Sequence, residues 1–246
     1  HQKEAVGFYA ASLTIVNLGF YLVGGIKNTI FHFLTEKFSQ TKNIKEPFFA
    51  DYFLKTSAFT LIIIGFFMLG GIIFRHELVR LVFGDAYLSS IPLLSVMLFS
   101  LPFLTLYILL HTCSISIGRI KEATLASIFS VLFAAFFYFV LTMKFGIQGT
   151  AYGLIISSFA LFFNYYFFAM KGIRKQFVFI FILVAFILLF VLFVAFLTGT
   201  FLWNIALFFL ANLFYILFLF IFGFVKKHEF LFLWSKGLEY LKIVKK

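Results

Sequence analysis

The chain has 246 residues, of which 63% are hydrophobic and 12% are charged, and its mean hydropathy is +1.10. Soluble domains carry roughly 45–50% apolar and about 25% charged residues, so this composition excludes a soluble domain. The net charge of +11 would suggest nucleic acid as the partner of a soluble protein. Here the cations gather in short loops between apolar segments, which is typical of membrane proteins and argues against a nucleic-acid partner.

Seven apolar segments are long enough to cross the hydrocarbon core of a bilayer, which takes about 20 residues of helix. Lipid cannot satisfy the polar groups of a backbone, and the segments lack the strict alternation of barrel strands. We therefore predict an all-α fold, a polytopic membrane bundle of about seven transmembrane helices. The predicted spans lie near Val6–Leu34, Tyr52–Phe74, Ile91–Ile117, Ala123–Met143, Thr150–Met170, Phe177–Leu197 and Leu202–Val225.

The loop charges predict an orientation for the bundle. Loops rich in lysine and arginine follow the first, third, fifth and seventh segments, and the loops between them carry few cations. This alternation predicts an N-terminus outside and a C-terminus in the cytoplasm. The last residues, 226–246, place apolar side chains at helical spacing between lysines, which predicts a basic amphipathic helix on anionic lipid of the cytoplasmic leaflet.

Polar residues follow one stripe of the first segment at about 100° per residue. We favour a water-filled cavity beside this stripe, because the stripe carries more polar side chains than helix packing requires. The stripe contains Thr14, Asn17, Tyr21, Gly24, Asn28 and His32. Stripes on the fourth and fifth segments favour helix packing, since small and hydroxyl residues let membrane helices approach. The stripe on the fourth segment contains Thr124, Ala135, Tyr138 and Thr142. The stripe on the fifth contains Thr150, Gly153, Ser157 and Asn164.

Lys27 is the one cation inside the first segment, and two interpretations stay open for it. Its long stem could reach the interface, or its ammonium could hold an anionic group of a substrate in the membrane. His32 and His111 could exchange protons near neutral pH, although a single histidine in a membrane helix is more often a packing residue. Pro102 lies inside the third segment and predicts a kink there.

No soluble catalytic pattern is present. The acids lie in loops rather than in the spans, no glycine-rich phosphate loop follows a strand, and one cysteine, Cys113, excludes an internal disulfide. We therefore predict no enzymatic activity, no catalytic residue, no metal site and no cofactor.

Four stretches resemble a known family. They are Val6–Ser12 at the entry of the first span, Leu81–Tyr87 after the second, the cytoplasmic turn Gly118–Ala123, and Lys144–Ala151 between the fourth and fifth. In order and spacing they are similar to the C-terminal part of the polysaccharide-exporting flippases, which belong to the multidrug/oligosaccharidyl-lipid/polysaccharide superfamily. The resemblance runs from about Val6 to Met170.

The resemblance implies a transporter of 12–14 helices in two lobes, located in the bacterial cytoplasmic membrane. Residues 1–170 would be five spans of the second lobe, 171–225 an additional terminal pair, and 226–246 a cytoplasmic tail. The opening His1, in place of Met, favours a fragment of a longer protein. The implied activity is flipping of lipid-diphosphate-linked oligosaccharide, with glycosyltransferases and a polymerase of the same pathway as further partners. Candidates for a central cationic cavity are Lys27, Asn28, Asn17 and His32.

Three other functions stay open at this point. The chain could export drugs or other small molecules within the same superfamily. It could be a membrane-bound polymerase or acyltransferase, although the loop between Arg75 and Ser90 is too short to build such a site alone. It could also be a seven-helix receptor, against which the lack of a cysteine pair argues.

Overall fold

The structure is a computed structural model that describes residues 2–41, 46–169 and 177–221. These residues form helices and no strand, which confirms the predicted all-α, multi-pass membrane fold. The chain divides into two units, His1–Thr198 and Gly199–Lys246, and each is described by itself. The predicted amphipathic tail, 226–246, lies outside the described residues.

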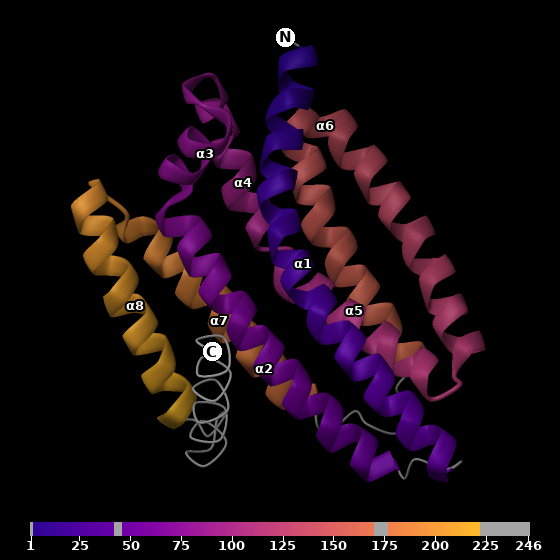
Figure 1. Ribbon diagram of the computed structural model, residues 1–246. Helices are drawn as coiled ribbons and strands as arrows, with labels where there is room; N and C mark the ends of the chain where they lie inside the picture. The colour runs from indigo at the N-terminus through magenta and orange to yellow at the C-terminus, as the bar shows by residue number, and fades with distance from the viewer. Residues whose placement is uncertain (1, 42–45, 170–176, 222–246) are drawn as a thin grey trace, which may run out of the picture. The chain divides into compact units, whose positions relative to one another are not determined.

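The first unit contains seven α-helices and one 3₁₀-helix among its described residues. In chain order they are α1 (Gln2–Thr41), α2 (Glu46–Ile73), α3 (Arg75–Phe83), η1 (Asp85–Ser90), α4 (Ile91–Leu98), α5 (Leu101–Ser116), α6 (Ile120–Ala169) and α7 (Phe177–Leu197) (Figure 1). The second unit holds α8 (Phe201–Ile221), where the Asn204 side chain accepts a hydrogen bond of 2.9 Å from the Gly199 N–H before the helix begins.

Five described helices are long and apolar enough to cross a membrane, and the bent pair Asp85–Leu98 and Leu101–Ser116 makes six. One of the five, Ile120–Tyr166, has 47 residues, about twice the length that a bilayer needs. Its backbone leaves helical geometry at Gly146, so it contains the two spans that the sequence predicts there. The described helices therefore account for all seven predicted segments.

The α6 hairpin, which comprises both arms of α6 on either side of Gly146, is closed by glycine. Gly146 has φ 58° and ψ −136°, a conformation that side chains with a Cβ rarely adopt. Three residues later, a Cβ on Gly149 would overlap the carbonyl of Leu141 on the other arm. The arms run side by side (Figure 1), and the hydroxyls of Thr142 and Thr150 meet across them at 3.0 Å.

The predicted third span bends where it contains proline. The two pieces, ending at Leu98 and beginning at Leu101, differ in direction by 48°. Pro102 occupies the first turn of α5, where its missing N–H removes one bond that would have joined the pieces. The kink predicted from Pro102 is confirmed. The bend leaves α4 and α5 each packed along α1, and a Cβ on Gly19 of α1 would lie 3.0 Å from Leu101.

A short cap of α3 and η1 joins α2 to α4 at the end of the bundle where α1 begins (Figure 1). Gly84, at φ 83°, ends α3, and Arg80 pairs with Asp85 across the turn at 2.8 Å. The Ser12 hydroxyl of α1 donates to the Ser90 carbonyl at 3.0 Å. These bonds hold the cap against the first turns of α1.

α7 packs along α2 with one aliphatic stripe. Arg75, which begins α3, donates a 3.1 Å hydrogen bond to the Thr198 hydroxyl beyond the end of α7. The other sides of α7 are exposed, in agreement with the wide lipid-facing surface expected of a helix without polar residues. The buried stripe consists of Ile180, Leu183, Val184, Ile187, Val191 and Val194.

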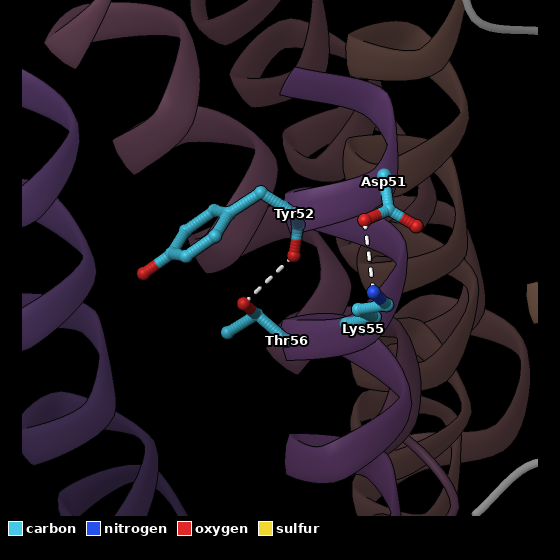
Figure 2. Close-up of polar contacts among 4 residues, drawn as sticks. All are labelled: Asp51, Tyr52, Lys55 and Thr56. Carbon is cyan, nitrogen blue, oxygen red and sulfur yellow. Dashed lines mark hydrogen bonds and ion pairs between the residues drawn. The ribbon is translucent and has the colours of Figure 1, made fainter. Parts of the chain in front are cut away.

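The beginning of α2 contacts α1 through an aromatic pair. The Tyr52 ring stacks on Phe33 of α1 with centroids 4.9 Å apart, while its carbonyl accepts a 2.8 Å hydrogen bond from the Thr56 hydroxyl (Figure 2). Asp51 and Lys55 form an exposed ion pair of 3.0 Å one helical turn apart. The polar groups at this end of α2 thus satisfy each other locally, which leaves the Tyr52 ring free to pack on α1.

We expect Gly149→Ala to destabilise the protein by about 1–3 kcal/mol, because the added methyl group forces the arms of the α6 hairpin apart. Denaturant unfolding in detergent micelles, followed by circular dichroism, measures the change. Gly24→Ala is the matched control, since a Cβ on Gly24 of α1 meets no atom within 4 Å. Equal stability of the two variants would contradict the close approach of the two arms.

Candidate functional site

The polar stripe predicted on the first segment lies on an exposed face of α1. Thr14, Tyr21, Asn28 and His32 are exposed and Asn17 is half-buried, with Tyr21 at 75%. The opposite face of the helix is buried against α4 and α5 through Ile15, Val16, Gly19, Val23, Ile30 and Leu34. The stripe is therefore the side of α1 that the described helices leave uncovered.

The four candidate residues do not form one cluster. Asn28 and His32 lie one helical turn apart on the exposed stripe, and Asn17 lies on the same stripe about 16 Å further along the axis. Lys27 is rotated by about 80° from Asn17, to the edge of the stripe. Lys27 is exposed.

Lys27 makes no hydrogen bond or ion pair with any other residue that the structure describes. An ammonium within a membrane span is unfavourable by roughly 2.5–3.5 kcal/mol on insertion scales unless water or a counter-ion reaches it. The nearest acid along α1 is Glu36, nine residues away or about 13 Å of helix. The geometry therefore leaves the Lys27 ammonium available to an anion.

A second polar group, which the sequence analysis missed, joins α5 to both arms of the α6 hairpin. The Tyr165 hydroxyl donates to the Ala123 carbonyl at 2.7 Å and lies 2.6 Å from the Ser127 hydroxyl, while its ring contacts the Tyr107 ring of α5. Because the Tyr165 proton points to Ala123, Ser127 donates to Tyr165. The spacing of Tyr107 and His111, one turn apart on α5, is the signal that could have found this group.

The aromatic rings of this group surround His111. The Tyr107 and Tyr165 ring centroids lie 5.9 Å and 5.6 Å from the imidazole, and 5.2 Å from each other. We call Tyr107, His111, Ser127 and Tyr165 the tyrosine–histidine cluster. Polar and aromatic groups of α5 and of both arms of α6 thus meet at one level of the bundle.

The stripes on the fourth and fifth segments pack against each other, as the sequence analysis favoured. Asn164 donates to the Ser130 hydroxyl at 3.2 Å across the hairpin. A Cβ on Gly153 would lie 3.0 Å from the Tyr138 ring. These residues therefore close the hairpin and leave α1 as the helix whose polar side is open.

Among the described residues, no group of three histidine, cysteine or carboxylate side chains could hold a metal ion. The chain matches no protein-family model and no curated protein. Among solved structures it is similar to the lipid II flippase MurJ in an inward closed conformation, with a TM-score of 0.61 and 17% sequence identity. The match covers 85% of this chain and 47% of that one, so the chain spans about half the length of the flippase.

At this level of identity the likeness concerns the fold. Asparagine and histidine side chains are unfavourable against lipid, so the polar stripe on α1 is a side of the bundle that lipid is not expected to cover.

We expect cysteines placed on the α1 stripe to react with a membrane-impermeant maleimide in the intact protein. Asn28→Cys and His32→Cys should label, because their side chains are exposed on a polar face. Leu132→Cys on α6 is the matched control, since Leu132 is 63% exposed among apolar neighbours and should face lipid. The buried native thiol, Cys113, should stay unlabelled. Labelling of Leu132→Cys alone would contradict the assignment.

Proposed function

We propose that the chain belongs to a transporter that flips lipid-diphosphate-linked oligosaccharide across the bacterial cytoplasmic membrane for polysaccharide biosynthesis. The observation that carries the proposal is the fold, which is shared with a lipid II flippase over 85% of the chain. Such a protein moves its substrate without catalytic chemistry. The substrate and the surrounding lipid would be its main partners, with glycosyltransferases and a polymerase supplying and consuming the substrate.

The open side of α1 supports a cavity for a polar headgroup. A lipid-linked sugar has hydroxyls and a diphosphate that must leave water while the lipid tail remains in the bilayer. Asn17, Asn28 and His32 offer hydrogen bonds along a stripe of about 22 Å, which suits an extended glycan. Lys27, at the edge of the stripe and without an ion-pair partner among the described residues, offers the charge that a diphosphate needs.

The proposal retains the domain organisation predicted from the sequence, with residues 1–170 as five spans of one lobe and 171–225 as a terminal pair. It also retains the predicted orientation, with the N-terminus of the chain outside. Lys27 would then lie in the cytoplasmic half of α1, where a substrate made in the cytoplasm enters.

Deletion of the gene tests the proposed substrate class. We expect the deletion strain to lose surface polysaccharide and to accumulate its lipid-linked precursor on the cytoplasmic side. Extraction of the lipid fraction, with sugar analysis, distinguishes a block in flipping from a block in synthesis. Normal polymer at the cell surface would overturn the proposal, and loss of drug resistance alone would favour the exporter alternative.

Substitution of Lys27 tests the role of its charge. We expect Lys27→Met to lower the rate of flipping about tenfold or more, as removal of a charge-assisted contact predicts, while Lys27→Arg retains most of it. The measurement is transfer of a fluorescent lipid-linked sugar in vesicles that hold the full protein. Lys144→Met is the matched control, because Lys144 is exposed near the turn of the α6 hairpin. Equal rates for Lys27→Met and the control would leave snorkelling as the role of Lys27.

A further inference from the structure

The short helix α3 has three different sides. His76 and Arg80 lie on one side of it and are exposed. At 100° per residue, Leu81 and Val82 lie on the side about 170° away, and they are exposed as well. Leu81, at 85%, is the most exposed large apolar side chain among the described residues, whereas Val79, between the two open sides, is buried. α3 therefore packs on the bundle by one side and leaves a polar side and an apolar side open.

Contacts with the bundle fix the rotation of α3 about its own axis. The Tyr87 ring of η1 lies 5.6 Å from the ring of Phe83, the last residue of α3, and 5.9 Å from that of Phe8 on α1. At the other end of α3, Arg75 donates its hydrogen bond to the Thr198 hydroxyl. The two open sides of α3 therefore keep their directions relative to the bundle.

The two spans that the cap connects both end at its level. The apolar part of α2, Asp51–Ile73, has 23 residues, and at 1.5 Å per residue it is about 35 Å long, enough to cross a hydrocarbon core of about 30 Å. The backbone leaves helical geometry at Phe74, with φ −100° and ψ 24°, so α3 starts in a new direction. α4 begins the next span at Ile91, directly after η1. α3 therefore lies where the acyl chains give way to the lipid headgroups.

The charges of the cap balance. Residues 75–90 contain two cations, Arg75 and Arg80, and two anions, Glu77 and Asp85. The side chains of Arg80 and Asp85 pair at 2.8 Å while they stay 70% and 64% exposed, so this part of the cap faces water. The cap thus has no excess positive charge with which to attract anionic lipid.

We propose that α3 is an interfacial helix whose apolar side, Leu81 and Val82, inserts among the acyl chains of the lipid beside the bundle. Amphipathic helices at this level bury their apolar side in the boundary between acyl chains and headgroups and keep their polar side in water. α3 has the geometry that this requires, because its two open sides are opposite and the bundle occupies a side between them. The partner is the lipid surface, whatever the charge of its headgroups.

This inference goes beyond the proposed function and does not depend on the substrate. Arg75 connects the cap to Thr198 beyond α7, and the Ser90 carbonyl connects it to Ser12 of α1. An anchored cap therefore sets the depth of α1 and α7 at this end of the bundle, in addition to that of α2 and α4.

The collision rates of spin labels on the full protein in phosphatidylcholine vesicles test the proposal. Leu81→Cys and His76→Cys each carry a nitroxide, and the native thiol, Cys113, is buried and stays in place. We expect the label at position 81 to collide more often with oxygen, which dissolves in acyl chains, than with a water-soluble nickel chelate. The label at position 76 should show the reverse order.

Each other outcome of this measurement overturns the proposal. More frequent collisions with nickel at position 81 would mean that the apolar side of α3 faces water. Shielding of position 81 from both reagents would mean that another protein surface, or a second copy of the chain, covers it. A preference for oxygen at both positions would mean that α3 lies wholly within the acyl chains.

Substitutions on the two open sides of α3 locate the effect. With the label at Val82, we expect Leu81→Glu to lower the ratio of oxygen to nickel collisions several-fold, because a carboxylate is unfavourable among acyl chains. His76→Glu is the matched control, which adds the same charge on the polar side and should leave the ratio unchanged. Equal effects of the two substitutions, or no effect of Leu81→Glu, overturn the proposal.

The lipid composition separates insertion of apolar side chains from attraction by charge. We expect the label at Val82 to give the same ratio in phosphatidylcholine vesicles with and without phosphatidylglycerol, because the cap is neutral. A preference for oxygen that occurs only with the anionic lipid would assign the contact to charge and overturn the proposal.

Discussion

Lipid offers no hydrogen bonds, and this one constraint decides how the bundle is built. Every polar group inside the membrane must find its partner in the protein or reach water. Tyr165, Ser127 and Asn164 satisfy it within the α6 hairpin, and Ser12 does so against the Ser90 carbonyl. The same bonds are what hold the helices in register, since apolar contacts between helices give little gain in a solvent that is itself apolar.

The stripe on α1 is a place where the described part of the first unit does not meet this constraint by itself. Most of its polar side chains are exposed, while Val16, Val23 and Leu34 on the opposite side of the same helix are buried. The polar side of a helix oriented in this way is expected to contact water, a ligand or other protein rather than lipid. That asymmetry is the feature of α1 on which we base the proposal that the chain transports a polar headgroup.

The sequence predicted the spans well because their length and hydropathy depend only on local composition. The turns at Gly84, Gly118 and Gly146 were also predictable, since a positive φ restricts the residue at the turn itself. The tyrosine–histidine cluster was not predictable from the sequence. It joins residues as far apart as Tyr107 and Tyr165, and it depends on how α5 packs against the α6 hairpin. The sequence analysis groups Lys27 with Asn17 and Asn28 in one candidate site because they are near each other in sequence. In the helix, Lys27 and Asn17 point in directions about 80° apart.

The tight turn at Gly146 has a consequence for how the protein is made. The turn through Gly146 and Gly149 is too short to let one arm insert while the other stays in water. We therefore expect the two arms to enter the bilayer together. With the orientation that we propose, the turn is the part of this pair that crosses the membrane. Lys144 is the one charged residue between Glu122 and Lys171, so in that orientation the pair would carry a single charge across the membrane.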